Sequence, residues 1–121
     1  MSETKLIDET LLTGSAKGWR LFRQNTGVGW VGKLRSKKAG TVILDNARVL
    51  HAGLCVGSSD VIGLRPVIIT ADMVGQTIGQ FVAAEIKTPG VPVTKEQAGF
   101  IEMVKRLGGH ARIVRDVADL D

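Results

Sequence analysis

Residues 81–87 read FVAAEIK, and this stretch decides the fold that the sequence predicts. Successive side chains of a strand point to opposite faces, so Glu85 and Lys87 share one face while Ala84 and Ile86 point into the other layer. Charged groups on an otherwise apolar strand cost several kcal/mol if they are buried without partners. The Glu85–Lys87 pair therefore needs a chemical reason to be there.

A second acid, Asp60, follows the tight sequence Gly-Ser-Ser at 57–59 and heads an apolar, β-branched run over residues 60–70. Residues 77–87 form a similar run, and residues 72–75 suit a hairpin connection between the two. In such a hairpin the carboxylates of Asp60 and Glu85 converge, and Mg²⁺ or Mn²⁺ would relieve their repulsion. Lys87 would help to activate water or stabilise charge on a phosphoryl group. The alternative is a surface Glu-x-Lys pair that contributes only a few tenths of a kcal/mol.

The other elements follow from periodicity and from start and stop signals. Residues 3–13 predict a helix that stops at Gly14. A second helix starts at Thr94, with Gln97 in the capping-box position, and stops at Gly108. Strands are expected over residues 19–23, 41–44, 48–50 and 110–115, with a turn at 45–46 and a flexible loop over 27–32. The predicted fold class is α/β, with one mixed β-sheet flanked by helices.

The composition is that of a folded globular protein. Of 121 residues, 44% are hydrophobic and 23% charged, which predicts a single domain over residues 1–121. No apolar run approaches the roughly 18 residues of a membrane span, and the acidic N-terminal segment does not resemble a secretory signal. We therefore expect a cytoplasmic protein without membrane contact. One cysteine excludes an internal disulfide, and with two histidines a zinc site of Cys and His is excluded as well.

The net charge of +4 is unevenly distributed along the chain. Residues 17–48 hold eight bases against Asp45 alone, so this stretch carries +7. With its glycines and with Trp19, Phe22 and Trp30, it suits contact with a phosphate backbone. The alternative is a solvated loop whose charge only aids solubility.

Asp60, followed 25 residues later by Glu85-Ile86-Lys87, resembles the core of the PD-(D/E)XK nucleases. The flanking segments are similar to one branch of that superfamily, the VRR-NUC (virus-type replication-repair nuclease) domain. They run in family order and cover nearly all of the chain from residue 20 to 116: FRQNTG at 22–27, GSSDVIG at 57–63, FVAAEIKTPG at 81–90, TKEQAGF at 94–100 and GG at 108–109. Ser59 stands where the family usually has proline. The resemblance implies a restriction-endonuclease-like core.

The resemblance also implies roles for individual residues. Divalent metal, Mg²⁺ or Mn²⁺, would be held by Asp60, Glu85 and the backbone carbonyl of Ile86. Lys87 would be the catalytic lysine, and Gln97 matches the family's glutamine near that lysine and the DNA backbone. The family also tends to place a metal-binding Glu on its first helix. Helical projection favours Glu3 over Glu9 for this place, the alternative being a favourable partner of the helix dipole.

DNA contacts are expected from the segment that matches FRxNxG and from the basic stretch after it. The residues are Arg23, Asn25, Lys33, Arg35, Lys37 and Lys38. For Arg23 and Asn25 the alternative is a strand end with Asn25 in a turn.

Taken together, the residues and the resemblance predict a metal-dependent, structure-selective DNA endonuclease. The resemblance further implies similarity to Holliday-junction resolvases and a place in phage or prophage DNA replication or repair. We expect a homodimer that pairs through an apolar hairpin over residues 67–82. A non-catalytic DNA-binding module of a replication complex is the first alternative. A small-molecule phosphohydrolase, which would use the same metal chemistry, is the second.

Overall fold

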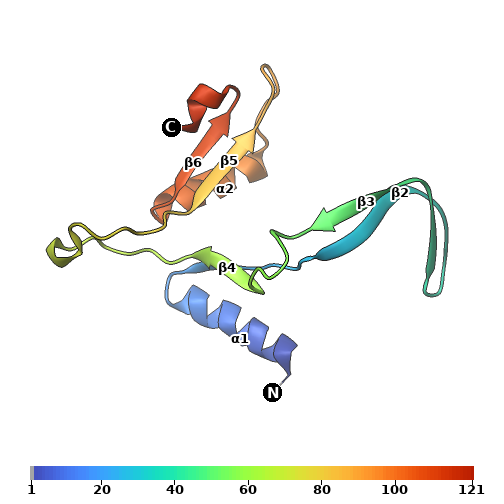
Figure 1. The fold of residues 1–121 in the computed structure, drawn as a ribbon, viewed down its shortest axis with the longest axis horizontal. Coiled ribbons are helices and arrows are strands. Elements are labelled where there is room, and N and C mark those ends of the chain that lie inside the picture. Colours follow the sequence, from blue (N-terminus) through green and yellow to red (C-terminus); the bar gives the residue numbers. More distant parts are fainter. Residues whose placement is uncertain (1) are drawn as a thin grey trace. The chain divides into compact units, whose positions relative to one another are not determined.

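A computed structural model describes residues 2–121 of the chain as two compact units (Figure 1). The helical unit comprises the chain up to Leu21 together with Gly63–Asp121, and the ribbon unit comprises Phe22–Ile62. The chain passes between the units in two paired strands, β1 (Arg20–Arg23) and β4 (Val61–Leu64). The ribbon unit is therefore an insertion within the sequence of the helical unit.

The helical unit begins with α1 (Glu3–Ala16) and later places α2 (Lys95–Arg106) against the strands β5 (Val82–Ile86) and β6 (His110–Val114). β5 and β6 pair in parallel, and α2 supplies the crossover that a parallel pair requires. Two short 3₁₀ turns, η1 (Ala71–Met73) and η2 (Val117–Leu120), complete the unit. No helix within residues 2–121 has the length and apolar character needed to span a bilayer.

The best-packed part of the helical unit is centred on α2. Val104 has no exposed surface, and the buried apolar residues are Ile7, Leu64, Ile101, Val104, Ala111 and Val114. The start of α2 confirms the predicted capping box, in which Thr94 Oγ1 accepts from the Gln97 amide at 3.1 Å and Gln97 Oε1 accepts from the Thr94 amide at 3.0 Å. Gly108, with a φ of 90°, follows the C-cap residue of the helix, as its sequence signal predicts.

Helix α1 continues past Gly14, so the predicted stop at that residue is wrong. Gly14 is buried within the helix, and a Cβ at this position would overlap the side chain of Leu21. The helix ends at Ala16, and Gly18 then adopts a φ of 79°, which residues with a Cβ rarely adopt. Gly14 is a packing glycine, whereas Gly18 is the one that allows the chain to turn.

Within residues 2–121 the strands form three two-stranded sheets, so the prediction of one mixed sheet is wrong. The strand expected over residues 60–70 ends at Leu64 because Pro66 lacks the amide hydrogen that a ladder requires. Residues 65–81 contain no strand, and the predicted hairpin that joined Asp60 to Glu85 does not form. The α/β class is confirmed, while the restriction-endonuclease-like arrangement stays a prediction.

The ribbon unit is built on an antiparallel pair of strands, β2 (Gly27–Lys38) and β3 (Thr41–Ala52). The loop expected over 27–32 and the turn expected at 45–46 are therefore wrong. The register shifts where Asn46 takes a positive φ of 52°, which asparagine tolerates, and the ladder continues beyond it. Gly32 permits this bulge because a Cβ there would lie 2.7 Å from the Asp45 carbonyl oxygen.

The close packing under α2 predicts opposite effects for two glycine substitutions. A Cβ at Gly109 would lie 2.5 Å from Val104 Cγ1 and 3.0 Å from the Phe81 carbonyl oxygen. We expect Gly109→Ala to lower the free energy of unfolding by about 1–3 kcal/mol. Gly99 lies within α2 with open space around it, so Gly99→Ala should raise that free energy by up to about 1 kcal/mol. Urea unfolding of both variants measures the difference, and equal effects would contradict the packing.

Candidate active site

Glu85 and Lys87 lie on one face of β5 and its continuation, as predicted. Glu85 Oε1 is 3.8 Å from Lys87 Nζ, and the side chains are 30% and 15% exposed, respectively. This face is the more buried of the two, since Val82 and Ile86 on the opposite face are 56% and 69% exposed. The expectation that Ile86 points into a packed layer is thus wrong.

The distance between the Glu85 carboxylate and the Lys87 ammonium determines whether each can bind a further group. At 3.8 Å they attract each other, but the separation exceeds that of a hydrogen bond. Among the described residues of the helical unit, neither charged group takes a hydrogen bond. The donors of Lys87 and the oxygens of Glu85 therefore have capacity left for a further group, such as a phosphate oxygen or a cation. A purely structural ion pair of this burial would gain from closing that distance.

The backbone around Lys87 is fixed by hydrogen bonds to β6 and to the segment that follows it. The Lys87 amide donates to the Val114 carbonyl at 3.0 Å, and Arg115 Nη1 donates to the Thr88 carbonyl at 2.9 Å. Asp119 Oδ2 accepts from the Arg115 amide at 3.0 Å and from the Asp116 amide at 3.1 Å. These bonds lower the pKa of the Asp119 carboxyl, the bond from Arg115 most. The C-terminal turn thus supports the strand end that carries Lys87.

Asp60 belongs to the ribbon unit, where it stands directly before β4. Its side chain is exposed, and its carbonyl oxygen accepts from the Gln24 amide at 2.8 Å. That bond fixes the backbone of Asp60 against the end of β1. Asp60 and Glu85 therefore lie in different units. The Gln24 amide holds the backbone of Asp60, and the pairing of β5 with β6 holds that of Glu85.

Gln24 is a positioning residue that the sequence patterns did not single out. Its Nε2 donates to Ser58 Oγ at 2.8 Å and to the Ser59 carbonyl at 2.9 Å. Its Oε1 accepts from the Leu54 amide and from Thr26 Oγ1, both at 3.0 Å. A single amide side chain thus ties the start of β2 to the whole loop that leads to Asp60. The available signal was an uncharged Gln within the FRQNTG segment, together with Ser58 in the Gly-Ser-Ser turn.

Two other predicted site residues lie at helix starts. Gln97 uses its Oε1 in the capping box of α2 and is half-buried. Glu3 is the first residue of α1, is exposed, and follows the N-cap Ser2. An acid in a first turn is favoured by the helix dipole, which accounts for Glu3 without a ligand. The roles of both residues in catalysis or metal binding stay predictions.

The predicted DNA-contacting residues lie along the ribbon unit. Arg23 ends β1, Asn25 lies between β1 and β2, and the other four are exposed along β2: Lys33, Arg35, Lys37 and Lys38. Arg35 forms an ion pair with Asp45 of β3. The remaining cations of β2 form no ion pair within the described part of the ribbon unit. The basic stretch is therefore a solvent-facing strand and not a loop.

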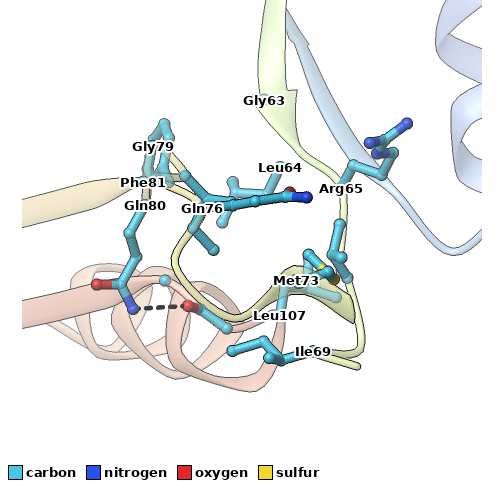
Figure 2. A pocket seen from close by; sticks show the side chains of 14 residues that line it. Gly63, Leu64, Arg65, Ile69, Met73, Gln76, Gly79, Gln80, Phe81 and Leu107 are labelled. Atoms are coloured by element: carbon cyan, nitrogen blue, oxygen red, sulfur yellow. Dashed lines mark hydrogen bonds between the residues drawn. The ribbon is translucent and has the colours of Figure 1, made fainter. Parts of the chain in front are cut away.

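A hollow lies in the helical unit, and the segment that connects β4 to β5 forms much of its lining. This open hollow of about 1080 Å³ is lined mainly by apolar side chains (Figure 2). Gln80 Nε2 donates to the Gly108 carbonyl at its edge, at 2.9 Å, and Arg65 points away from it. No residue predicted to act in catalysis lines it. The hollow is thus a separate feature from the Glu85–Lys87 pair.

The donors expected at a metal site are two carboxylates and a backbone carbonyl, all hard oxygen ligands. This donor set fits Mg²⁺ or Mn²⁺ by its chemistry. The Glu85 side chain is 30% exposed, so solvent reaches it. Within residues 2–121 no three His, Cys, Asp or Glu side chains are grouped so as to hold a metal ion.

The chain was compared with protein-family models, with curated proteins and with solved structures, and none of the three comparisons gave a match.

The Gln24 bonds predict a local loss of protection in Gln24→Ala. This change removes the acceptor of the Leu54 amide and both side-chain bonds to residues 58–59. We expect amide exchange at Leu54 to accelerate about tenfold or more, since each lost bond contributes about 0.5–1.5 kcal/mol. Gln76→Ala is the matched control, because Gln76 lies in the helical unit. Equal exchange rates at Leu54 in both variants, measured by NMR, would show that Gln24 does not hold the loop.

Proposed function

We propose that this protein is a metal-dependent DNA nuclease with its catalytic centre at Glu85 and Lys87. The observation that carries the proposal is the half-buried acid–base pair at 3.8 Å, on one face of a strand end. Such a pair keeps binding capacity for both a cation and an anion, and metal-dependent phosphodiester hydrolysis uses both. The resemblance of the surrounding segments to the VRR-NUC branch of the PD-(D/E)XK nucleases supports the same assignment.

Each residue has a defined part in the proposed reaction. Asp60, Glu85 and the Ile86 carbonyl would hold Mg²⁺ or Mn²⁺, with Glu3 as a further candidate ligand. When bound, such an ion supplies positive charge beside the phosphate and lowers the pKa of water. The ammonium of Lys87 orients the attacking water or offsets the charge that grows on the phosphate oxygens. Gln97 would contact the DNA backbone through its amide nitrogen, because its oxygen is used by the helix cap.

The proposed substrate is DNA, cut at a junction, a flap or another branched form, in the manner of Holliday-junction resolvases. The exposed bases of β2 support a polyanionic substrate over a small phosphate ester. A homodimer and a cytoplasmic place in phage or prophage replication or repair belong to the same proposal. The segment expected to mediate the dimer contains no strand before Val82, but Ile68 and Val74 within it are 88% and 83% exposed, which supports a partner there. Light scattering distinguishes a dimer from the 12.9 kDa monomer.

A non-catalytic DNA-binding module is the second candidate. The observation that favours it is that Asp60 and Glu85 lie in different units, whereas the basic strand is complete within one unit. Such a module would bind DNA with or without a divalent ion and would never cut it.

Cleavage assays with a Lys87 variant test the nuclease proposal. Labelled junction, flap and linear duplex DNA are incubated with Mg²⁺, Mn²⁺ or EDTA. We expect metal-dependent cleavage that falls about 100-fold or more in Lys87→Ala, with DNA binding retained, because the charge next to the phosphate is lost. Lys95→Ala is the matched control, since Lys95 is an exposed lysine at the start of α2.

Equal cleavage by Lys87→Ala and the parent would remove Lys87 from the mechanism. Binding of all three DNAs without cleavage under any metal condition would favour the binding module.

A further inference from the structure

The net charge of the protein belongs entirely to the ribbon unit. This unit holds six Lys and Arg against two Asp, which gives +4, the net charge of the whole chain. The helical unit holds ten bases and ten acids and is formally neutral. A second copy of the chain therefore offers no excess of acid to meet the ribbon. Charge complementarity points instead to a polyanion.

The β2–β3 ribbon is long, narrow and unaccompanied by a third strand. Each strand has 12 residues, so the ribbon extends about 40 Å at roughly 3.3 Å per residue. Its two strands are joined at the tip by Ala39 and Gly40, where Gly40 takes a φ of 76° and has open space around it. The tip is thus slim. A two-stranded ribbon of this kind fits the major groove of undistorted B-form DNA, which is about 12 Å wide, whereas the minor groove of about 6 Å would have to widen to take it.

Four of the six basic residues of the ribbon unit lie in the half of β2 nearer the tip, and they face both sides of the ribbon. Lys37 pairs with Val42 and Lys38 with Thr41, so the two lysines project from opposite faces. A sheet that lay flat on one phosphate backbone would need cations on one face only. A ribbon inside a groove has a phosphate backbone on either side, and cations on both faces meet this geometry.

Asp45 is the one acid on strands β2 and β3, and its negative charge opposes the positive charge of the basic residues. It lies directly across from Lys33 and forms an ion pair with Arg35. Phosphates must compete with its carboxylate for Arg35, and its negative charge lies across the ladder from Lys33. Removing this acid should therefore strengthen DNA binding, whereas removing the tip lysines should weaken it.

We propose that the β2–β3 ribbon is a docking arm that enters the major groove of B-form duplex DNA and binds it independently of any metal ion. The inference rests on the proposed DNA substrate but not on catalysis. Duplex RNA is excluded as the partner by shape, since the deep, narrow major groove of the A-form does not admit a ribbon. The arm would hold duplex DNA while the Glu85–Lys87 centre acts on the phosphodiester bond.

Fluorescence anisotropy in EDTA measures this binding without cleavage. The probes are a 30-base-pair DNA duplex and an RNA duplex of the same sequence, with the full chain. We expect the DNA to bind at least tenfold more tightly than the RNA. Methyl green, which occupies the major groove, should displace the protein from DNA, and netropsin, which occupies the minor groove, should not. Equal binding of RNA, or displacement by netropsin alone, would overturn the proposal.

Paired variants assign the binding to the ribbon tip. Lys37→Glu with Lys38→Glu should weaken DNA binding at least tenfold and reduce the slope of log K against log salt by about 2, close to 0.9 for each lost phosphate contact. The matched control is Lys5→Glu with Lys95→Glu, a double reversal at exposed first-turn positions of α1 and α2, where acids are tolerated. The control pair changes the net charge by the same amount as the tip pair, so it measures the loss that net charge alone causes. It should bind DNA within about threefold of the parent. Equal losses in both pairs would overturn the proposal.

Asp45→Asn tests the arm through a gain of binding instead of a loss. We expect this variant to bind DNA several-fold more tightly than the parent, and weaker binding would count against the arm. The outcomes also separate the two proposals. Binding in EDTA without cleavage in Mg²⁺ or Mn²⁺ retains the arm and removes the nuclease. Cleavage with unchanged binding by the tip variant retains the nuclease and removes the arm.

Discussion

The packing of α2 on the parallel pair β5–β6 is the constraint on which the proposed centre depends. Val104 has no exposed surface, and Gly109 lets the chain pass it closely enough for β6 to pair with β5. That pairing, continued by the bond from the Lys87 amide to Val114, fixes the end of β5. A charged pair that is 15% and 30% exposed costs desolvation energy, so a well-packed neighbourhood is needed to keep it in place.

The ribbon unit has a different kind of anchor. The Gln24 side chain makes its hydrogen bonds to the 54–59 loop, and the Gln24 amide holds the carbonyl of Asp60. Polar contacts therefore hold this loop in place, whereas apolar packing holds the helical unit together. Such a network is rigid only while every partner is present, which makes it sensitive to a single substitution. The two carboxylates of the proposed centre thus depend on two physically different supports.

Local signals predicted local structure well. The capping box at Thr94 and Gln97 depends on residues three positions apart, and strand alternation placed Glu85 and Lys87 on one face, so both were readable. The roles of the glycines were not, because Gly14 and Gly32 are required by neighbours distant in sequence. Pro66 ended a strand that its β-branched neighbours favoured. Gln24 was missed because an uncharged amide acquires its role only when the loop folds over it.

The proposal that Asp60 and Glu85 serve one metal ion is tested most directly by Mn²⁺ titration, followed by calorimetry. The parent, Asp60→Asn, Glu85→Gln and the double variant form a thermodynamic cycle. We expect each single change to weaken Mn²⁺ binding about tenfold or more, and the double variant to lose far less than the sum, because both groups serve the same ion. Strictly additive losses, or binding that either change leaves intact, would contradict a shared site.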